Sequence, residues 1–172
     1  EMCKRDSLRG MLVDDLVVVG AEPLFVTDYI SCGHVDPEVI ASVVKGIAQA
    51  CQKAGCALLG GETAEHPGLL APDEFDVAGA TTGVVERDEI LGPERIAEGD
   101  ALIAVASSGL HSNGYSLVRH VLLEQAGWTL DRHVDELGRT VGEELLEPTI
   151  VYAADLLALI HHSEVHAMCH VT

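Results

Sequence analysis

Basic residues are scarce in this sequence. Its 172 residues include 10 Lys and Arg against 28 Asp and Glu, which gives a formal net charge of −18 at pH 7. The phosphate backbone of nucleic acids and anionic membrane surfaces both repel a chain with this charge. We therefore expect neither as a partner. An anionic substrate would need local help from backbone N–H groups, a metal ion or a few well-placed basic side chains.

Long apolar runs are also missing. The apolar stretches are far too short to cross a bilayer, and the first residues, EMCKRDSLRG, lack the apolar segment of a signal peptide. Hydrophobic residues make up 48% of the chain and charged residues 22%, which is typical of globular proteins. We expect a cytoplasmic protein with a core large enough to fold without disulfides or other staples.

The cysteines do not form a disulfide framework. There are five, an odd number, scattered through apolar segments, which favours reduced, buried thiols: Cys3, Cys32, Cys51, Cys56 and Cys169. The cluster HAMCH at 166–170 contains residue types that bind zinc, but the alternation in EVHAMCHV also fits a strand. Because a second pair of ligands is missing, a zinc-binding module is the least favoured interpretation.

Helix and strand patterns alternate through the first half of the chain. Two segments carry apolar residues at helical spacing, and each is followed by a glycine where helices commonly stop. Three β-rich runs read as strands, and the small residues of the last one suggest close packing. In chain order we expect a helix over 6–19, a strand over 23–31, a helix from Pro37 to Gly55, a strand over 56–60 and a strand over 75–87.

The pattern restarts after LGPERIAEGD at 91–100, a stretch of glycine, proline and charge. We take it as the boundary between two domains, 1–97 and 98–172. The fold class is mixed α/β. In the second half we expect a buried strand over 101–107, a loop over 109–114, a helix from 117 to near 127, a helix over 148–161 and a strand over 164–171.

The loop GLHSNG places Gly109 and Gly114 at either end of a strand-to-helix connection. Backbone N–H groups in such a loop can bind an anion, and a phosphate is the natural occupant. The spacing alone fits equally well a tight turn in which Ser112 or Asn113 caps the helix. His111 in such a loop is more often exposed than catalytic.

Two acidic motifs are candidates for binding a cation. Glu62 and Glu65 follow the strand over 56–60, where ligands collect in α/β proteins, and Glu62 could bind Mg²⁺. From this motif alone a solvated acidic loop is the favoured reading. Asp14 and Asp15 lie in an otherwise apolar helix, so one of them must be buried or at the edge of the solvent. A buried carboxylate needs a partner, and a cation would serve.

Three segments together resemble the aminoimidazole ribonucleotide synthetases, the cyclo-ligases of purine synthesis. They are DDLVVVGAEPLFVTDY, GCALLGGETAEHPG with DVAGATTGVVE, and GDALIAVASSGLHSNGYSLVR. The resemblance implies a two-domain α/β fold shared with selenophosphate synthetase and thiamine monophosphate kinase, and a homodimer that pairs through the first domains. It also implies the ATP-dependent closure of formylglycinamidine ribonucleotide to the imidazole, with ADP and phosphate released.

The same resemblance suggests roles for particular residues. Asp15 matches an aspartate expected near Mg-ATP, with a catalytic and metal-binding role, whereas Asp14 replaces the usual asparagine. His111 is the best candidate for proton transfer. The resemblance implies contacts to the nucleotide phosphates or to Mg²⁺ for Gly60, Gly61, Glu62 and Thr63, with Glu62 as a metal ligand. It implies contacts to the ribonucleotide substrate for Ser108, Gly109, His111, Ser112, Asn113 and Gly114.

The sequence also departs from the pattern of these enzymes. It begins inside the first domain, without the upstream D-G-x-G-T-K segment, and stops at HVT, so both domains look partial. If the 172 residues are the whole molecule, we expect little or no cyclo-ligase activity; as part of a longer chain they would carry the enzyme's function. The alternatives are a non-catalytic fragment and a related ATP-dependent synthetase or kinase of the same fold.

Overall fold

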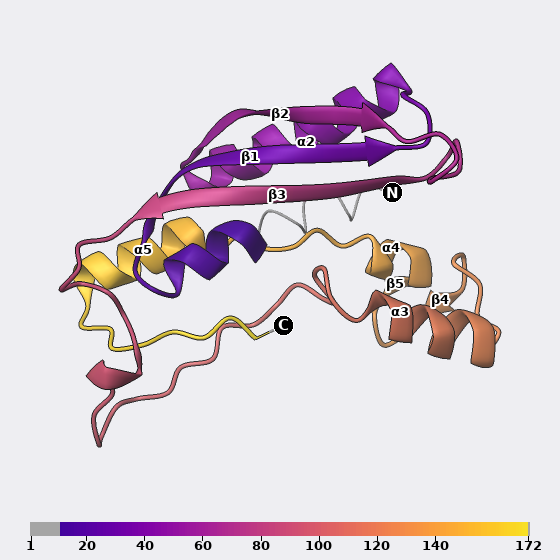
Figure 1. Ribbon diagram of the computed structural model, residues 1–172. Helices are drawn as coiled ribbons and strands as arrows, with labels where there is room; N and C mark the ends of the chain where they lie inside the picture. Colours follow the sequence, from indigo (N-terminus) through magenta and orange to yellow (C-terminus); the bar gives the residue numbers. More distant parts are fainter. Residues whose placement is uncertain (1–10, 172) are drawn as a thin grey trace.

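The computed structural model describes residues 11–171 (Figure 1). A three-stranded sheet has its helices on one face, and the second half of the chain consists of short helices, a small hairpin and long irregular segments. Among the residues described, no helix is both long and apolar enough to cross a membrane.

The sheet has the strand order β2-β1-β3. Its central strand β1 (Glu22–Cys32) pairs in parallel with β2 (Ala57–Glu65) and antiparallel with β3 (Phe75–Val84). Parallel neighbours require a crossover, which here is the helix α2 (Pro37–Ala54). The strand predicted over 23–31 is therefore confirmed, and the strand predicted over 75–87 is confirmed up to Val84.

Local capping fixes both ends of α2, which lie where the sequence predicted them, at Pro37 and before Gly55. The Asp36 carboxylate accepts hydrogen bonds from the N–H groups of Glu38 and Val39, and Pro37 occupies the first turn. At the other end Gly55 is left-handed, with φ +75°, and the Cys56 N–H donates to the Cys51 carbonyl at 3.0 Å. This is the six-to-one hydrogen bond of a Schellman motif.

The core lies between the sheet and three helical segments. Residues 11–17 are helical, which confirms that part of the helix predicted over 6–19; residues 6–10 lie outside the described part of the chain. A Cβ on Gly79 would lie 2.7 Å from Leu12 Cδ1, and one on Gly83 3.0 Å from Leu16 Cδ1, so β3 packs closely as predicted. The fully buried side chains at the centre are Val13, Val17, Val26, Ile30, Val43, Ile47 and Ala153.

The second half contains only short elements. A single turn, η1 (Pro93–Arg95), precedes the helix α3 (Tyr115–Val118), which continues as the π-helical η2 (Arg119–Gln125). This confirms the helix predicted from 117 to near 127. The elements that follow are β4 (His133–Val134), β5 (Arg139–Thr140), α4 (Val141–Leu145) and α5 (Ala153–His162).

Three secondary-structure predictions are wrong. Residues 61–65 are not a loop but continue β2, because they pair with residues 28–32 of β1. The segments 101–107 and 164–171 are not strands, because no strand of the described residues forms a ladder with either. As a result Leu102 is fully exposed rather than buried. In addition, the helix predicted over 148–161 begins only at Ala153.

The prediction for the cysteines is confirmed in part. None of the four described cysteines forms a disulfide: Cys32 and Cys51 are buried, Cys56 is partly buried and Cys169 is exposed. Burial raises the pKa of the Cys56 thiol. Cys3 lies outside the described residues.

Gly55 should be the residue that fixes the end of α2. Gly55→Ala is expected to lower the free energy of unfolding by about 1 kcal/mol, because only glycine adopts this φ without strain. Gly55→Asn should lose less, since asparagine tolerates the left-handed region. Urea unfolding of the three proteins measures this, and equal stabilities would contradict it.

Candidate functional site

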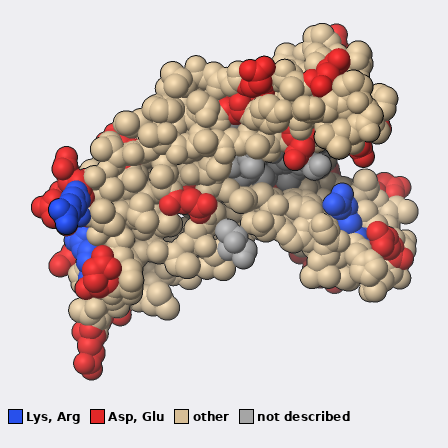
Figure 2. Space-filling view, viewed as in Figure 1, with Lys and Arg blue, Asp and Glu red and all other residues tan. Residues whose placement is uncertain are grey.

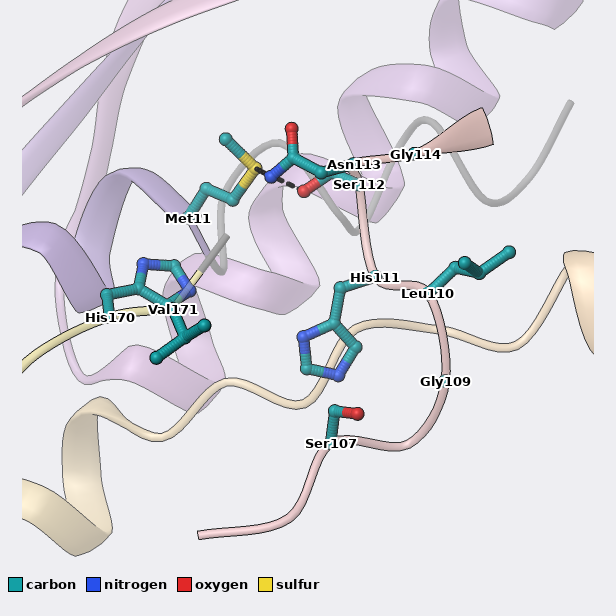
Figure 3. Close-up of a pocket in the computed structure, with 10 residues that line it drawn as sticks. All are labelled: Met11, Ser107, Gly109, Leu110, His111, Ser112, Asn113, Gly114, His170 and Val171. Atoms are coloured by element: carbon teal, nitrogen blue, oxygen red, sulfur yellow. Dashed lines mark hydrogen bonds between the residues drawn. The ribbon is translucent and has the colours of Figure 1, made fainter. Parts of the chain in front are cut away.

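The loop singled out from the sequence lines a cavity of about 510 Å³ (Figure 3). The opposite wall comes from the first helix, through Met11, and from the end of the chain, through His170 and Val171. Among the described residues that line the cavity there is no Lys or Arg, so of these groups only backbone N–H groups and histidine could bind an anion. The loop residues in the lining are Ser107, Gly109, Leu110, His111, Ser112, Asn113 and Gly114.

The charge on the surface agrees with this lining. On the face shown in Figure 2, acidic side chains are widely spread and basic ones are confined to two places. The described residues of this face therefore form no broad positive surface that would attract a negatively charged ligand.

Hydrogen bonds between the loop region and the segment 145–152 hold the loop in place. The Ser108 hydroxyl donates to the Pro148 carbonyl at 2.7 Å, and the Tyr115 hydroxyl donates to the Leu145 carbonyl at 3.1 Å. The Tyr152 hydroxyl donates to the Ala106 carbonyl at 2.7 Å. The loop is thus tied at both ends, although the segment 101–107 has no regular structure.

His111 lies in the middle of the loop in a strained conformation. Its φ of +55° is the one positive value among the non-glycine residues described. Its Nε2 lies 3.1 Å from the backbone nitrogen of Ser108, which donates to it, and 3.0 Å from the Ser108 hydroxyl. Burial, with a smaller contribution from His170, lowers the pKa of His111. The bond from the Ser108 N–H requires an unprotonated Nε2, which places the proton of a neutral ring on Nδ1, whereas the contact with the Ser108 hydroxyl would require a proton on Nε2.

The helix-capping alternative for this loop is wrong. The helix after the loop has Gly114 as its N-cap, with φ +81° and no side-chain hydrogen bond. Ser112 and Asn113 contact the Met11 sulfur instead, the Asn113 amide at 3.6 Å. Both side chains therefore serve to join the loop to the first helix.

Asp15 reaches this site through His170. The exposed Asp15 carboxylate lies 2.8 Å from Nδ1 of His170, whose ring lines the cavity. The structure therefore brings one predicted nucleotide-binding residue close to the predicted substrate loop. His170 itself belonged, in the sequence, to the segment interpreted as a strand or a zinc module.

Asp14 is the buried member of the acidic pair. It is 2% exposed, and its Oδ1 accepts a hydrogen bond from the Tyr152 N–H at 3.1 Å, while Oδ2 has no hydrogen-bond partner among residues 11–171. Burial raises the pKa of Asp14 from 3.8 to about 6. The sequence correctly predicted that one aspartate would be buried. Within the described part of the chain, the partner of that carboxylate is the backbone at the start of α5.

The segment GGET lies on β2, and its side chains point alternately to the two faces of the sheet. Glu62 is opposite Tyr29, on the face without helices, whereas Thr63 is opposite the fully buried Ile30, on the helical face. A Cβ on Gly61 would lie 2.3 Å from the carbonyl oxygen of Asp28, so only glycine fits there. Gly60, with φ +145°, also needs glycine.

The structure thus separates Glu62 from Asp15. The helix that carries Asp15 packs on the opposite face of the sheet from the Glu62 side chain. Glu65, the other acidic candidate, accepts a hydrogen bond from the Val35 N–H and lies 3.0 Å from Nδ1 of His34. These carboxylates do not converge on one point.

No protein-only metal site forms among residues 11–171. No three His, Cys, Asp or Glu side chains of this range come close enough to hold an ion. His166 lies 2.8 Å from Asp100, and His170 is paired with Asp15, so the zinc-module interpretation is wrong for these residues. Mg²⁺ needs only one or two carboxylates when phosphates and water supply its other ligands, and exposed Asp15 fits that requirement.

Several contacts in this site could not be predicted from the sequence. Met11 and Ser112 are 101 positions apart, Asp15 and His170 are 155 apart, and Asp14 and Tyr152 are 138 apart. Periodicity and motif spacing act over a few residues. Only the folded chain could therefore show that Met11, His170 and Tyr152 belong to this region.

Two family models match the chain. The model for the AIR synthase related protein N-terminal domain matches residues 7–85, and the model for the C-terminal domain of the same family matches residues 97–172. The chain belongs to the AIR synthase related family. The resemblance found in the three sequence segments is thereby confirmed at the level of the family.

The curated relatives within this family are much longer than the chain. It is similar to proteins named phosphoribosylformylglycinamidine cyclo-ligase from Bacillus thuringiensis (strain Al Hakam) and Bacillus anthracis, with 52% identity to each. The similarity extends over 163 residues, which are 95% of this chain and 47% of each relative. The chain spans about half the length of the curated relatives it matches.

Solved structures show the same fold. The hydrogenase maturation protein HypE from E. coli matches 95% of this chain and 45% of its own, with a TM-score of 0.61 and 21% identity. The thiamine-monophosphate kinase from Stenotrophomonas maltophilia K279a matches 92% of this chain and 47% of its own, with a TM-score of 0.62 and 21% identity. The predicted sharing of a fold with thiamine monophosphate kinase is confirmed.

The buried carboxyl of Asp14 should make stability fall as pH rises. The folded state holds the Asp14 proton more tightly than the unfolded state, so the stabilisation is complete below about pH 4 and is lost as pH rises through about 6. Asp14→Asn keeps an oxygen acceptor for the Tyr152 N–H but does not titrate. Between pH 4 and pH 7, wild type should lose roughly 2 kcal/mol of stability relative to this variant.

Urea unfolding at several pH values measures this difference, in which the titrations of all other groups cancel. A difference that stays constant from pH 4 to pH 7 would show that Asp14 is not a buried titrating group.

Proposed function

We propose that these 172 residues are the part of a cyclo-ligase that closes formylglycinamidine ribonucleotide to aminoimidazole ribonucleotide, with ATP converted to ADP and phosphate. The observation that carries this is the 52% identity to proteins named phosphoribosylformylglycinamidine cyclo-ligase, over 95% of the chain. The regions that the two family models match, 7–85 and 97–172, include the residues that line the cavity. Structural neighbours below 25% identity support the fold but not the substrate.

The proposed reaction is a phosphoryl transfer followed by ring closure. The γ-phosphoryl group of ATP passes to the formyl amide oxygen, which makes that oxygen a good leaving group. The amidine nitrogen then attacks the same carbon, the carbon–oxygen bond breaks, phosphate leaves, and the nitrogen gives up a proton. Catalysis of such a sequence rests mainly on positioning and on electrostatic stabilisation.

We assign the substrate side of this reaction to the loop. Ser108, Gly109, Ser112, Asn113 and Gly114 are proposed to hold the ribonucleotide. His111 is proposed to accept the proton of the attacking nitrogen, and its lowered pKa keeps the ring neutral and able to do so. The loop residues in the cavity lining and the histidine at their centre support this assignment.

We assign the nucleotide side to Asp15 and to Gly60, Gly61, Glu62 and Thr63. Crystal structures of HypE in complex with ATP and of AaThiL with AMPPCP and TMP have this fold, with TM-scores of 0.59 and 0.60. Mg²⁺ is proposed to arrive with the ATP phosphates and to take Asp15 as a protein ligand. Because Glu62 faces the other side of the sheet, it would act in a different part of the site.

We also propose two domains, 1–97 and 98–172, each of them partial, and a homodimer through the first. The two family models match the chain on either side of residues 86–96, which supports a boundary there. The sheet face opposite the helices is uncovered, with Tyr29 40% and Val84 52% exposed, which supports pairing through that face. A cytoplasmic location would follow from a role in purine synthesis.

Turnover tests the proposed reaction. Protein purified from its own cells, at whatever length it has there, should release ADP with formylglycinamidine ribonucleotide but not with thiamine monophosphate. His111→Asn should reduce kcat by at least about 100-fold. His120→Asn, at an exposed position on η2, is the matched control and should keep full activity.

The possible outcomes test the role of His111 separately from the proposed cyclo-ligase reaction. Full activity of His111→Asn would overturn the assigned role of His111. Absence of ADP release with this substrate would overturn the reaction. Release with thiamine monophosphate instead would favour the kinase alternative, and inactivity of a chain of 172 residues would favour the non-catalytic fragment.

The bare sheet face should control the oligomeric state. Ala80 lies there, opposite Thr27 of β1, and Ala80→Glu should halve the mass seen by light scattering, because it puts a charge into an apolar interface. Ala48→Glu, at an exposed position of α2, is the matched control and should leave the mass unchanged. A monomeric wild type at high concentration would contradict the dimer.

A further inference from the structure

Tyr152 is outside the cavity lining but contacts three of the parts that build the cavity. It is the residue just before α5, and it is half-buried. Its backbone N–H, its hydroxyl and its ring each have a different partner, namely Asp14, Ala106 and His111. No motif in the sequence pointed to this residue.

The hydroxyl group fixes the entry to the loop. It donates to the Ala106 carbonyl at 2.7 Å, two residues before Ser108. The segment 101–107 has no ladder partner among the described residues, so its position depends on such isolated contacts. A second one, from the Ser108 hydroxyl to the Pro148 carbonyl, ties the loop to the same stretch of chain.

The ring packs beside His111. The two ring centroids are 6.1 Å apart, with the planes tilted by 42°. His111 has a φ of +55°, a conformation that costs a non-glycine residue energy and persists only where its surroundings hold it. The Tyr152 ring and the Ser108 N–H, which donates to Nε2, are two of the contacts that hold it.

The backbone N–H anchors Tyr152 to the core. It donates to Asp14 at 3.1 Å, and Asp14 lies between the fully buried Val13 and Val17 on the same helix. That helix also supplies Met11 to the cavity lining, and its Asp15 contacts His170, which lines the cavity. Tyr152 therefore connects this helix to the loop on the other side of the cavity.

We propose that Tyr152 is the positioning residue for His111. By holding Ala106 and packing on the imidazole, it keeps Nε2 as the acceptor of the Ser108 N–H, so that the ring proton stays on Nδ1. In Figure 3 the Nδ1 edge of His111 is turned towards the side of the cavity where His170 lies. The use of this tautomer in proton transfer rests on the function proposed above, whereas the positioning itself does not.

Nitrogen NMR of the imidazole rings tests the proposal without any activity. In wild-type protein above the pKa of His111, the ¹⁵N shifts should identify a proton on Nδ1. Tyr152→Phe keeps the ring but removes the donor to Ala106. The variant should show a mixture of both tautomers, and the Ser108 amide should exchange with solvent about fivefold faster, as expected for the loss of one hydrogen bond.

A matched control separates this effect from the loss of any hydroxyl near the loop. Tyr115→Phe removes another hydroxyl that ties the loop to this stretch, by donating to the Leu145 carbonyl, and it should change the His111 shifts less than Tyr152→Phe does. Wild-type protein with the proton on Nε2 would overturn the proposal, even if Tyr152→Phe fails to fold. Unchanged shifts and exchange in a folded Tyr152→Phe would also overturn it.

The readouts distinguish this proposal from the proposed function. In an active enzyme, Tyr152→Phe should lower kcat with little change in KM, because Tyr152 is not one of the residues that line the cavity. If the NMR results are as expected but the protein releases no ADP with the ribonucleotide, the positioning stands and the function fails. If turnover is found while the His111 tautomer is indifferent to Tyr152, the function stands and the positioning fails.

Discussion

The hydrogen bond between the Asp14 carboxylate and the Tyr152 N–H is the contact on which the arrangement of the site depends. It joins two residues 138 positions apart, one in the buried face of the first helix and one at the start of α5. A buried carboxyl is costly, as its raised pKa shows, and the start of a helix offsets part of that cost. Removal of either partner would leave a buried polar group unpaired.

This contact matters because the second half has little regular structure of its own near the site. The first half is held by β1 and its two neighbours, and by a core around Val26, Ile30 and Ile47. The loop, in contrast, follows a segment without a ladder and is placed by single hydrogen bonds to residues 145–152. The position of the loop therefore depends on the segment that leads into α5. The position of α5 depends in turn on its packing against the core.

The chemistry of the cavity reflects the small number of basic residues in the chain. A chain with few basic residues lines its cavity with histidine, hydroxyl and amide groups and with glycine backbone. These groups bind an anion by hydrogen bonds that depend on exact placement rather than by long-range attraction. A positioned and neutral His111 is consistent with that design, since a charged imidazole would need a carboxylate beside it.

The sequence by itself determined the elements whose signals are local. The helix α2 has its cap at Asp36, its proline at Pro37 and its left-handed glycine at Gly55, and the sequence predicted both ends. The three segments that resemble the cyclo-ligases also identified the family without any structure. Capping, periodicity and motif spacing all act within a few residues, so they can be recognised in the sequence without the structure.

Only the tertiary structure decided which of the predicted residues meet. It showed that GGET continues a strand and divides Glu62 and Thr63 between two faces, because β1 pairs with all of it. It left 101–107 without a ladder, although the apolar pattern predicted a buried strand. It also paired Asp14 with Tyr152 and Asp15 with His170. Such contacts depend on the path of the whole chain, which no local pattern encodes.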